Sequence, residues 1–96
     1  TTFVIEADGD SMIDAGISSG DILLVDSSKE PLDGEIVLAY LGGALTIKRF
    51  KRIDGVIELR PENKEGNYRI LRPTEWDDFR VAGVVTALGR ILGRGP

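Results

Sequence analysis

The chain has 96 residues, of which 42% are hydrophobic and 29% charged, and its formal net charge at pH 7 is −4. This composition is typical of one globular domain and excludes a disordered or fibrous chain. The sequence contains neither cysteine nor histidine, which excludes disulfides, thiolate or imidazole catalysis and most zinc sites. Covalent catalysis would therefore need Ser, Thr, Lys or carboxylate groups.

The net charge of −4 argues against nucleic acid as the main partner, because such binding normally needs a basic face. Residues 1–43 contain nine acidic groups and one lysine, whereas residues 44–96 contain eleven basic and seven acidic groups. We interpret this as two differently charged surfaces of one domain; complementarity in self-association is the alternative. No apolar run approaches the roughly 20 residues of a membrane span, and no signal-peptide pattern opens the chain, so we expect a cytoplasmic protein.

Seven short segments are predicted to be strands, because they are rich in apolar and β-branched residues and are separated by turn residues. The Gly-Gly pair at 42–43 predicts a hairpin, and the Asp-Gly pair at 54–55 predicts another turn. In chain order the predicted strands are residues 2–8, 21–26, 35–41, 44–50, 56–60, 68–72 and 79–88.

One short helix is predicted within residues 11–17, with Asp10 or Ser11 as its N-terminal cap and Gly16 at its end. With so many short strands and frequent turns, the fold class is predicted to be all-β, either barrel-like or a sandwich.

The whole of residues 1–96 is predicted to form one domain, in which the Gly- and Arg-rich residues 89–96 are a loose tail. The last predicted strand alternates in apolar content and is expected to present an edge. A charge at Val84 should then weaken either the core or a dimer. Trp76 is either a loop anchor or an interface residue, and the sequence does not decide between them.

Ser11 follows a predicted strand and lies in a tight turn, Gly-Asp-Ser-Met, at residues 9–12. Peptide N–H groups in such a turn can point together, as an oxyanion hole requires. The alternative is that the serine only caps the short helix.

Lys48 lies in the middle of a predicted strand, where alternation places it on one face with Thr46 and Phe50. Partial desolvation there would lower the pKa of the amine and leave it neutral near pH 7. A neutral amine can take the proton of a serine hydroxyl, which makes a Ser-Lys dyad. The alternative is a solvated lysine in the basic run at 48–52, a run that alternation divides between two faces.

The residues around these two positions resemble the LexA/UmuD/phage-repressor family of self-cleaving Ser-Lys peptidases, and UmuD in particular. Residues 9–26 resemble the nucleophile segment of that family, and residues 46–49 (Thr-Ile-Lys-Arg) resemble its strand with the catalytic lysine. The 37 positions between the serine and the lysine suit the UmuD arrangement. Further similar segments are Gly-Glu-Ile-Val at 34–37, Pro-Glu-Asn at 61–63 and Gly-Val-Val at 83–85.

The resemblance implies the roles of the site residues. Ser11 is expected to be the nucleophile and Lys48, unprotonated, the general base. The backbone N–H groups of Asp10 and Ser11 are expected to form the oxyanion hole, and Gly9 and Met12 to shape the nucleophile turn. The resemblance further implies an all-β catalytic domain of short twisted strands, with at most one short helix after the nucleophile, and no metal or cofactor.

Partners also follow from the resemblance. Family members cut one bond in their own N-terminal segment, stimulated by the RecA–single-strand DNA filament after DNA damage. The UmuD-like interpretation implies a processed homodimer that joins a UmuC-like translesion polymerase subunit in SOS mutagenesis. The alternative is the autoproteolytic and dimerisation domain of a LexA-like or phage repressor that controls transcription. Neither implies direct DNA binding by this domain or contact with a membrane.

The family's Cys-Gly or Ala-Gly cleavage bond lies upstream of the serine, so we expect this chain to be a processed form or an isolated catalytic domain. We interpret its own Ala-Gly pairs, at 15–16 and 82–83, as structural. A membrane-anchored signal peptidase, which also uses a Ser-Lys dyad, is disfavoured. A dimeric interaction module with a spent dyad is the alternative from another functional class.

Overall fold

In the computed structural model, which describes residues 1–92, six antiparallel strands form one sheet in the order β1-β2-β6-β3-β4-β5. This confirms the all-β prediction. A single 3-10 turn, η1 (Ile13–Ala15), interrupts the strands. The strands are β1 (Thr2–Glu6), β2 (Ile22–Asp26), β3 (Ile36–Leu41), β4 (Ala44–Ile53), β5 (Val56–Arg60) and β6 (Phe79–Gly89).

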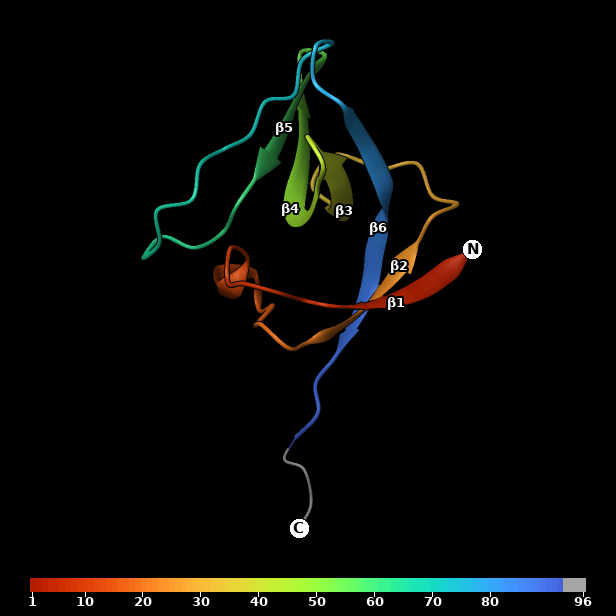
Figure 1. The fold of residues 1–96 in the computed structure, drawn as a ribbon, viewed down its shortest axis with the longest axis vertical. Coiled ribbons are helices and arrows are strands. Elements are labelled where there is room, and N and C mark those ends of the chain that lie inside the picture. Colours follow the sequence, from red (N-terminus) through yellow and green to blue (C-terminus); the bar gives the residue numbers. More distant parts are fainter. Residues whose placement is uncertain (93–96) are drawn as a thin grey trace.

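β6 joins the two halves of the sheet, because it pairs with β2 on one side and with β3 on the other (Figure 1). Thr86 has no partner on β2 and Ala82 has none on β3, so the strand contains a bulge toward each neighbour. Bulges increase local twist, and in Figure 1 β1 and β2 cross the direction of β4 and β5. The expectation that the last strand presents an edge is therefore wrong: β6 is central, and the edges are β1 and β5.

Gly83 allows β2 to approach β6 closely. A Cβ at this position would lie 2.5 Å from the Val25 Cγ1 atom and 2.9 Å from the Asp26 carbonyl oxygen. The close packing of β2 against β6 therefore explains the glycine of the Ala-Gly pair at 82–83.

Two hydrophobic clusters form the core. The first lies between β3, β4, β5 and β6 and consists of Val37, Ala39, Phe50, Leu59 and Val84. The second lies under the turn that contains Ser11 and consists of Ala7, Met12, Ile17 and Leu23, with Ile5, Ala15, Ile36, Ile47 and Val85 packed against it. The nucleophile turn is thus attached to the core by its own apolar side chains.

The predicted strand at 68–72 is wrong: of these residues only Leu71 pairs, in an isolated bridge with Leu59. The segment after β5 instead turns back toward the N-terminal part of the chain. Glu58, on β5, binds both Arg60 and Arg72 at 2.6 and 2.8 Å and so holds the far end of this segment.

The short helix is only the single turn η1, and the predicted side-chain caps are absent. Met12, at the N-cap position, makes no side-chain hydrogen bond, while the Ile13 N–H donates to the backbone carbonyl of Asp10 at 3.2 Å. The turn ends at Gly16 as predicted, because φ is +90° there and glycine adopts this conformation without strain.

The tail begins later than the sequence predicts. Gly89 still belongs to β6, and the Arg90 guanidinium binds the buried Asp21 carboxylate at 2.8 and 2.7 Å. Ile91 and Leu92 are exposed and belong to no strand, and residues 93–96 of the predicted tail lie outside the described residues.

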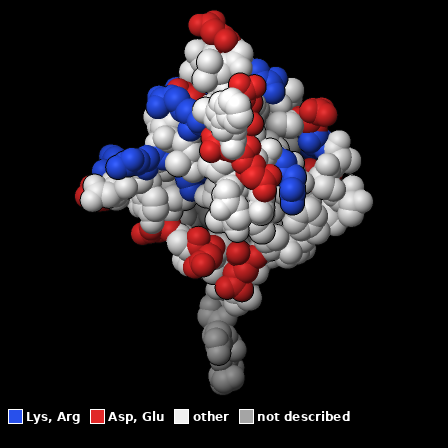
Figure 2. All heavy atoms as spheres, turned by 45° about the horizontal axis from the view of Figure 1, so that its top comes forward, with Lys and Arg blue, Asp and Glu red and all other residues white. Residues whose placement is uncertain are grey.

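The basic run at 48–52 is divided among different environments, as alternation predicts. Lys48 is buried, Arg49 and Lys51 form ion pairs with Glu62 and Asp33, and the Arg52 guanidinium lies over the Phe50 ring. Acidic and basic side chains are interspersed on the face shown in Figure 2.

The loop before β6 exposes an aromatic side chain. Trp76 is 89% exposed, so the interpretation of this residue as a loop anchor is wrong. No helix among residues 1–92 is long and apolar enough to span a membrane.

Val84→Asp should unfold much of the population, because the side chain is 2% exposed inside the first cluster. A buried, unpaired carboxylate should lower the free energy of unfolding by about 3 kcal/mol or more. Urea denaturation measures the change. Thr86→Asp, at an exposed position of the same strand, is the control and should change stability little. An unchanged midpoint for Val84→Asp would contradict this placement of β6.

The Asp21–Arg90 pair should make stability depend on acid pH. Hydrogen bonds from Arg90 lower the pKa of Asp21 from 3.8 to about 2. Because the folded pKa is the lower one, the pair stabilises the fold above about pH 4, and this is lost as the pH falls toward 2. Arg90→Met should therefore lower the free energy of urea unfolding at pH 7 and narrow its difference between pH 7 and pH 3.

The matched control is Arg69→Met, since Arg69 is exposed and forms no ion pair within residues 1–92. It should leave both quantities unchanged. If the free energy of unfolding differs between pH 7 and pH 3 by the same amount in the wild type and in Arg90→Met, the Asp21–Arg90 pair does not cause the acid dependence of stability.

Candidate active site

The nucleophile turn, residues 9–12, is held in place from below. Gly9 has a φ of +87°, a backbone conformation that other residues rarely adopt and that glycine adopts without strain. This conformation reverses the chain after β1. Met12 is 2% exposed within the second cluster, and its carbonyl accepts the N–H groups of Ala15 and Ile17 at 3.0 and 3.2 Å. Met12 thus joins the turn to the second cluster, and Gly9 supplies its positive φ.

The segment that follows β5 holds the same turn from the side. The Glu62 N–H donates to the Ser11 carbonyl at 2.7 Å, and the Glu62 carbonyl accepts the Asp14 N–H at 2.8 Å. The Asn63 amide donates to the Asp10 carbonyl at 2.9 Å. The sequence showed a Pro-Glu-Asn resemblance at 61–63 but gave no sign that these residues contact the serine turn.

Lys48 and Ser11 meet, although 37 positions separate them. The Lys48 Nζ atom lies 3.1 Å from the Ser11 Oγ atom and also donates to the Thr46 hydroxyl. The strand alternation that placed Thr46 and Lys48 on one face is correct. Ser11 Oγ lies 3.5 Å from the Ile47 carbonyl, which is a weak contact at most.

The environment of Lys48 favours the neutral amine. The residue is 7% exposed, and it forms no ion pair within residues 1–92. Burial lowers the pKa of its amine below 10.5, because desolvation penalises the ammonium form. The hydroxyls of Ser11 and Thr46 accept its hydrogen bonds without supplying a negative charge.

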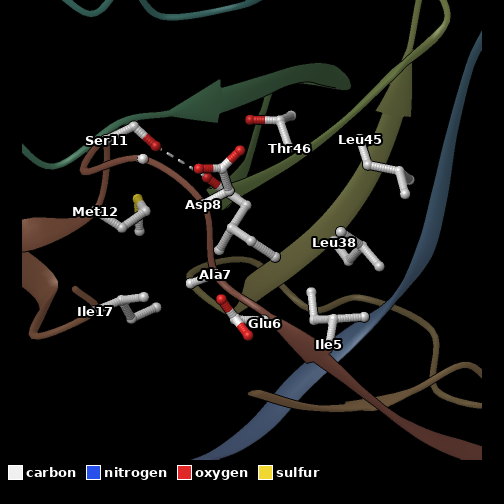
Figure 3. A pocket seen from close by; sticks show the side chains of 12 residues that line it. Ile5, Glu6, Ala7, Asp8, Ser11, Met12, Ile17, Leu38, Leu45 and Thr46 are labelled. Carbon is white, nitrogen blue, oxygen red and sulfur yellow. Dashed lines mark hydrogen bonds between the residues drawn. The ribbon is translucent and has the colours of Figure 1, made fainter. Parts of the chain in front are cut away.

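A pocket of about 320 Å³ opens beside Ser11 (Figure 3). Apolar side chains line most of it, and the carboxylate-bearing residues Glu6 and Asp8 lie on the side formed by the end of β1. The apolar lining consists of Ile5, Ala7, Met12, Ile17, Leu38, Leu45 and Ile47. Such a pocket suits an extended peptide with small apolar side chains.

The two expected oxyanion donors differ in their surroundings. The Ser11 N–H has no hydrogen-bond acceptor among residues 1–92. Beside Asp10, the Tyr68 hydroxyl donates to the carboxylate of the same residue. This hydrogen bond, burial and the Asp10 charge raise the pKa of Tyr68. The sequence gave no indication of Tyr68 at this site.

No group of three or more Asp, Glu, His or Cys residues that could hold a metal ion occurs in the described part of the chain.

Comparisons with known proteins identify the family. The Peptidase S24-like family matches residues 1–86. The chain is 43% identical to the LexA repressor of Syntrophomonas wolfei, over 92% of this chain and 41% of that protein. It is 40% identical to the LexA repressor of Paracidovorax citrulli (92% and 38%) and 39% identical to that of Desulfitobacterium hafniense (96% and 43%).

The chain therefore belongs to the Peptidase S24-like family, the LexA/UmuD/phage-repressor group of self-cleaving serine peptidases. This confirms the family that the motifs indicated. The chain spans about two fifths of the length of these relatives.

Lys48→Met should stabilise the fold while it removes the amine. Methionine fills a similar volume without a buried charge, so the free energy of unfolding at pH 7 should rise by about 1 kcal/mol. Because the folded pKa of Lys48 is lowered, the stability of the wild type should increase with pH between that pKa and 10.5. The difference in stability between Lys48→Met and the wild type should therefore narrow over this pH range. Urea unfolding at several pH values tests both statements.

Lys51→Met is the matched control, since it removes an ion-paired lysine from the same strand. It should give no stabilisation. A Lys48→Met protein less stable than the wild type at pH 7 would contradict a desolvation cost at Lys48.

Proposed function

We propose that this chain is the catalytic domain of a LexA-type repressor that cleaves its own polypeptide with a Ser-Lys dyad. Ser11 is the nucleophile and Lys48 is the general base. The proposal rests on one observation: a buried amine, which has no carboxylate partner within residues 1–92, lies 3.1 Å from the hydroxyl of the serine turn.

The chemistry follows from this contact. Neutral Lys48 takes the Ser11 proton while Ser11 Oγ forms a bond to the scissile carbonyl carbon. The N–H groups of Ser11 and Asp10 donate to the resulting oxyanion. The Lys48 ammonium then returns the proton to the leaving amine, and the peptide C–N bond breaks. Water, deprotonated by Lys48, finally hydrolyses the acyl-serine ester and regenerates both groups.

The biological role is drawn from the relatives. LexA repressors match most of this chain, which supports a DNA-damage (SOS) role in which cleavage relieves transcriptional repression. We include a homodimer and stimulation by the RecA–single-strand DNA filament in this proposal. The UmuD-like role, with a UmuC-like polymerase partner, remains the second candidate because of the Gly-Asp-Ser-Met segment at 9–12.

Self-cleavage is tested on the full-length gene product. Incubation alone at about pH 10, where a lysine of lowered pKa is neutral, should give one discrete cut upstream of Thr1, seen by mass spectrometry. Ser11→Ala and Lys48→Ala should each abolish the cut. The rate should rise with pH through the lowered pKa of Lys48 and level off below pH 10.5, because the neutral amine is the base.

Lys51→Ala serves as the control for loss of a lysine from β4 and should cleave normally. Undiminished cleavage without Ser11 or Lys48, or a flat rate from about pH 6 to 10, would refute the dyad. The sequence of the released segment separates the two roles: a DNA-binding domain supports the repressor, and a short arm supports the UmuD-like protein.

A further inference from the structure

The nucleophile and the base lie on separate elements that need a link. Ser11 lies in the turn after β1, whereas Lys48 lies on β4. Within residues 1–92, the direct hydrogen bonds between these elements involve the reacting region itself: Lys48 Nζ to Ser11 Oγ, and the 3.5 Å contact of Ser11 Oγ with the Ile47 carbonyl. The hydrogen bond between the Ser11 hydroxyl and the Lys48 amine changes when the proton is transferred, so it cannot by itself hold the two groups in position.

We propose that the Arg49–Glu62 ion pair positions Ser11 against Lys48, by connecting the strand that bears the base to the segment that grips the nucleophile turn. This inference rests on the proposed Ser-Lys function. Arg49 and Glu62 are positioning residues, because neither touches the reacting atoms.

Glu62 grips the turn through its backbone. Its N–H donates to the Ser11 carbonyl at 2.7 Å, and its carbonyl accepts the Asp14 N–H at 2.8 Å. These two bonds attach residue 62 to both ends of the segment 11–14 and so fix the position of the serine turn relative to residue 62. A shift of Glu62 must therefore shift the serine.

The Glu62 side chain fixes the same residue to β4. Its carboxylate accepts Arg49 Nε at 2.7 Å and Arg49 Nη2 at 2.9 Å. The third guanidinium nitrogen, Nη1, donates to the Gly34 carbonyl at 3.0 Å. A bidentate pair fixes direction as well as distance, and Arg49 is the chain neighbour of Lys48.

The Arg49–Glu62 ion pair is partly shielded from solvent. Both side chains are about one third exposed, so solvent screens the interaction less than it does for a fully exposed pair. The Arg49 guanidinium lowers the pKa of Glu62, and the Glu62 carboxylate raises the pKa of Arg49. Both groups therefore stay charged over the pH range in which Lys48 titrates.

Loss of the link should loosen the turn and admit water to the amine. Lys48 faces the hydroxyls of Ser11 and Thr46, and the carboxylates of Glu6 and Asp8 lie in the adjoining pocket. With more water, the pKa of Lys48 should rise toward 10.5. At pH 8 less neutral amine is present and the serine is less well placed, so cleavage slows.

A double-mutant cycle tests the proposal on the full-length gene product. Glu62→Ala and Arg49→Met should each slow self-cleavage at pH 8 by about tenfold or more, and the rate should recover partly at pH 10. The double variant should be no slower than the slower single variant, because both substitutions break one link. Arg49→Lys, which keeps one charged hydrogen bond but loses the bidentate geometry, should cleave at a rate between those of Arg49→Met and the wild type.

A second measurement needs no cleavage. In the 96-residue chain with ¹³C-labelled lysine, the Lys48 Cε signal should titrate at higher pH in Glu62→Ala than in the wild type. Lys51→Met breaks the Lys51–Asp33 pair on the same strand and should change neither the rate nor the titration. If Glu62→Ala fails to fold, Arg49→Lys and Arg49→Met provide the comparison.

The results separate two failures. A wild-type Lys48 with an ordinary pKa, or cleavage that survives Ser11→Ala, would refute the proposed function. A wild type that cleaves through Ser11, together with variants of Arg49 and Glu62 that keep its rate and its Lys48 titration, would refute only the positioning role. Additive effects in the cycle would also refute it.

Discussion

The burial of an amine without a carboxylate partner is the constraint on which the site depends. A carboxylate near Lys48 would raise the pKa of the amine and hold it as an ammonium ion, which cannot accept a proton. The structure surrounds Lys48 with hydroxyls instead, from Ser11 and Thr46, and places the carboxylate of Glu62 on the neighbouring arginine. The Glu62 carboxylate is thus paired with Arg49 and not with the adjacent Lys48.

A desolvated charge costs stability, and the rest of the fold offsets that cost. The second hydrophobic cluster lies directly under the serine turn, and Met12 joins the turn to it. The first cluster supports the strand of the base through Phe50. β6 connects the two halves of the sheet, and its two bulges, with Gly83, let β2 and β3 pair with the same strand. The serine and the lysine therefore sit on opposite halves that one central strand holds together.

Ion pairs within the domain join the acidic first part of the chain to its more basic second part. Asp21 and Asp33 come from the acidic first part, and their partners Arg90 and Lys51 come from the more basic second part. The basic run at 48–52 contributes to the core, to ion pairs and to a cation–π contact. Because these ion pairs join charges from the two parts of the sequence, acidic and basic side chains are interspersed on the face shown in Figure 2.

The sequence by itself determined the fold class and six of the seven predicted strands, and it marked Ser11 and Lys48 as the candidate reacting residues. Short apolar segments between turn residues predict β structure, because strand alternation and turn chemistry are local properties, and alternation alone placed Lys48 with Thr46. Ser11 was marked by its turn and by family resemblance. Only the tertiary structure decided the central place of β6, the return of residues 61–68 to the serine turn and the contacts of Arg49, Glu62 and Tyr68. These depend on which distant segments pack together, and local patterns do not specify long-range pairing. For the same reason Tyr68–Arg72 resembles a strand in sequence but is drawn off the sheet, and Arg90, in a tail that looks unstructured, is held by a buried aspartate 69 positions away.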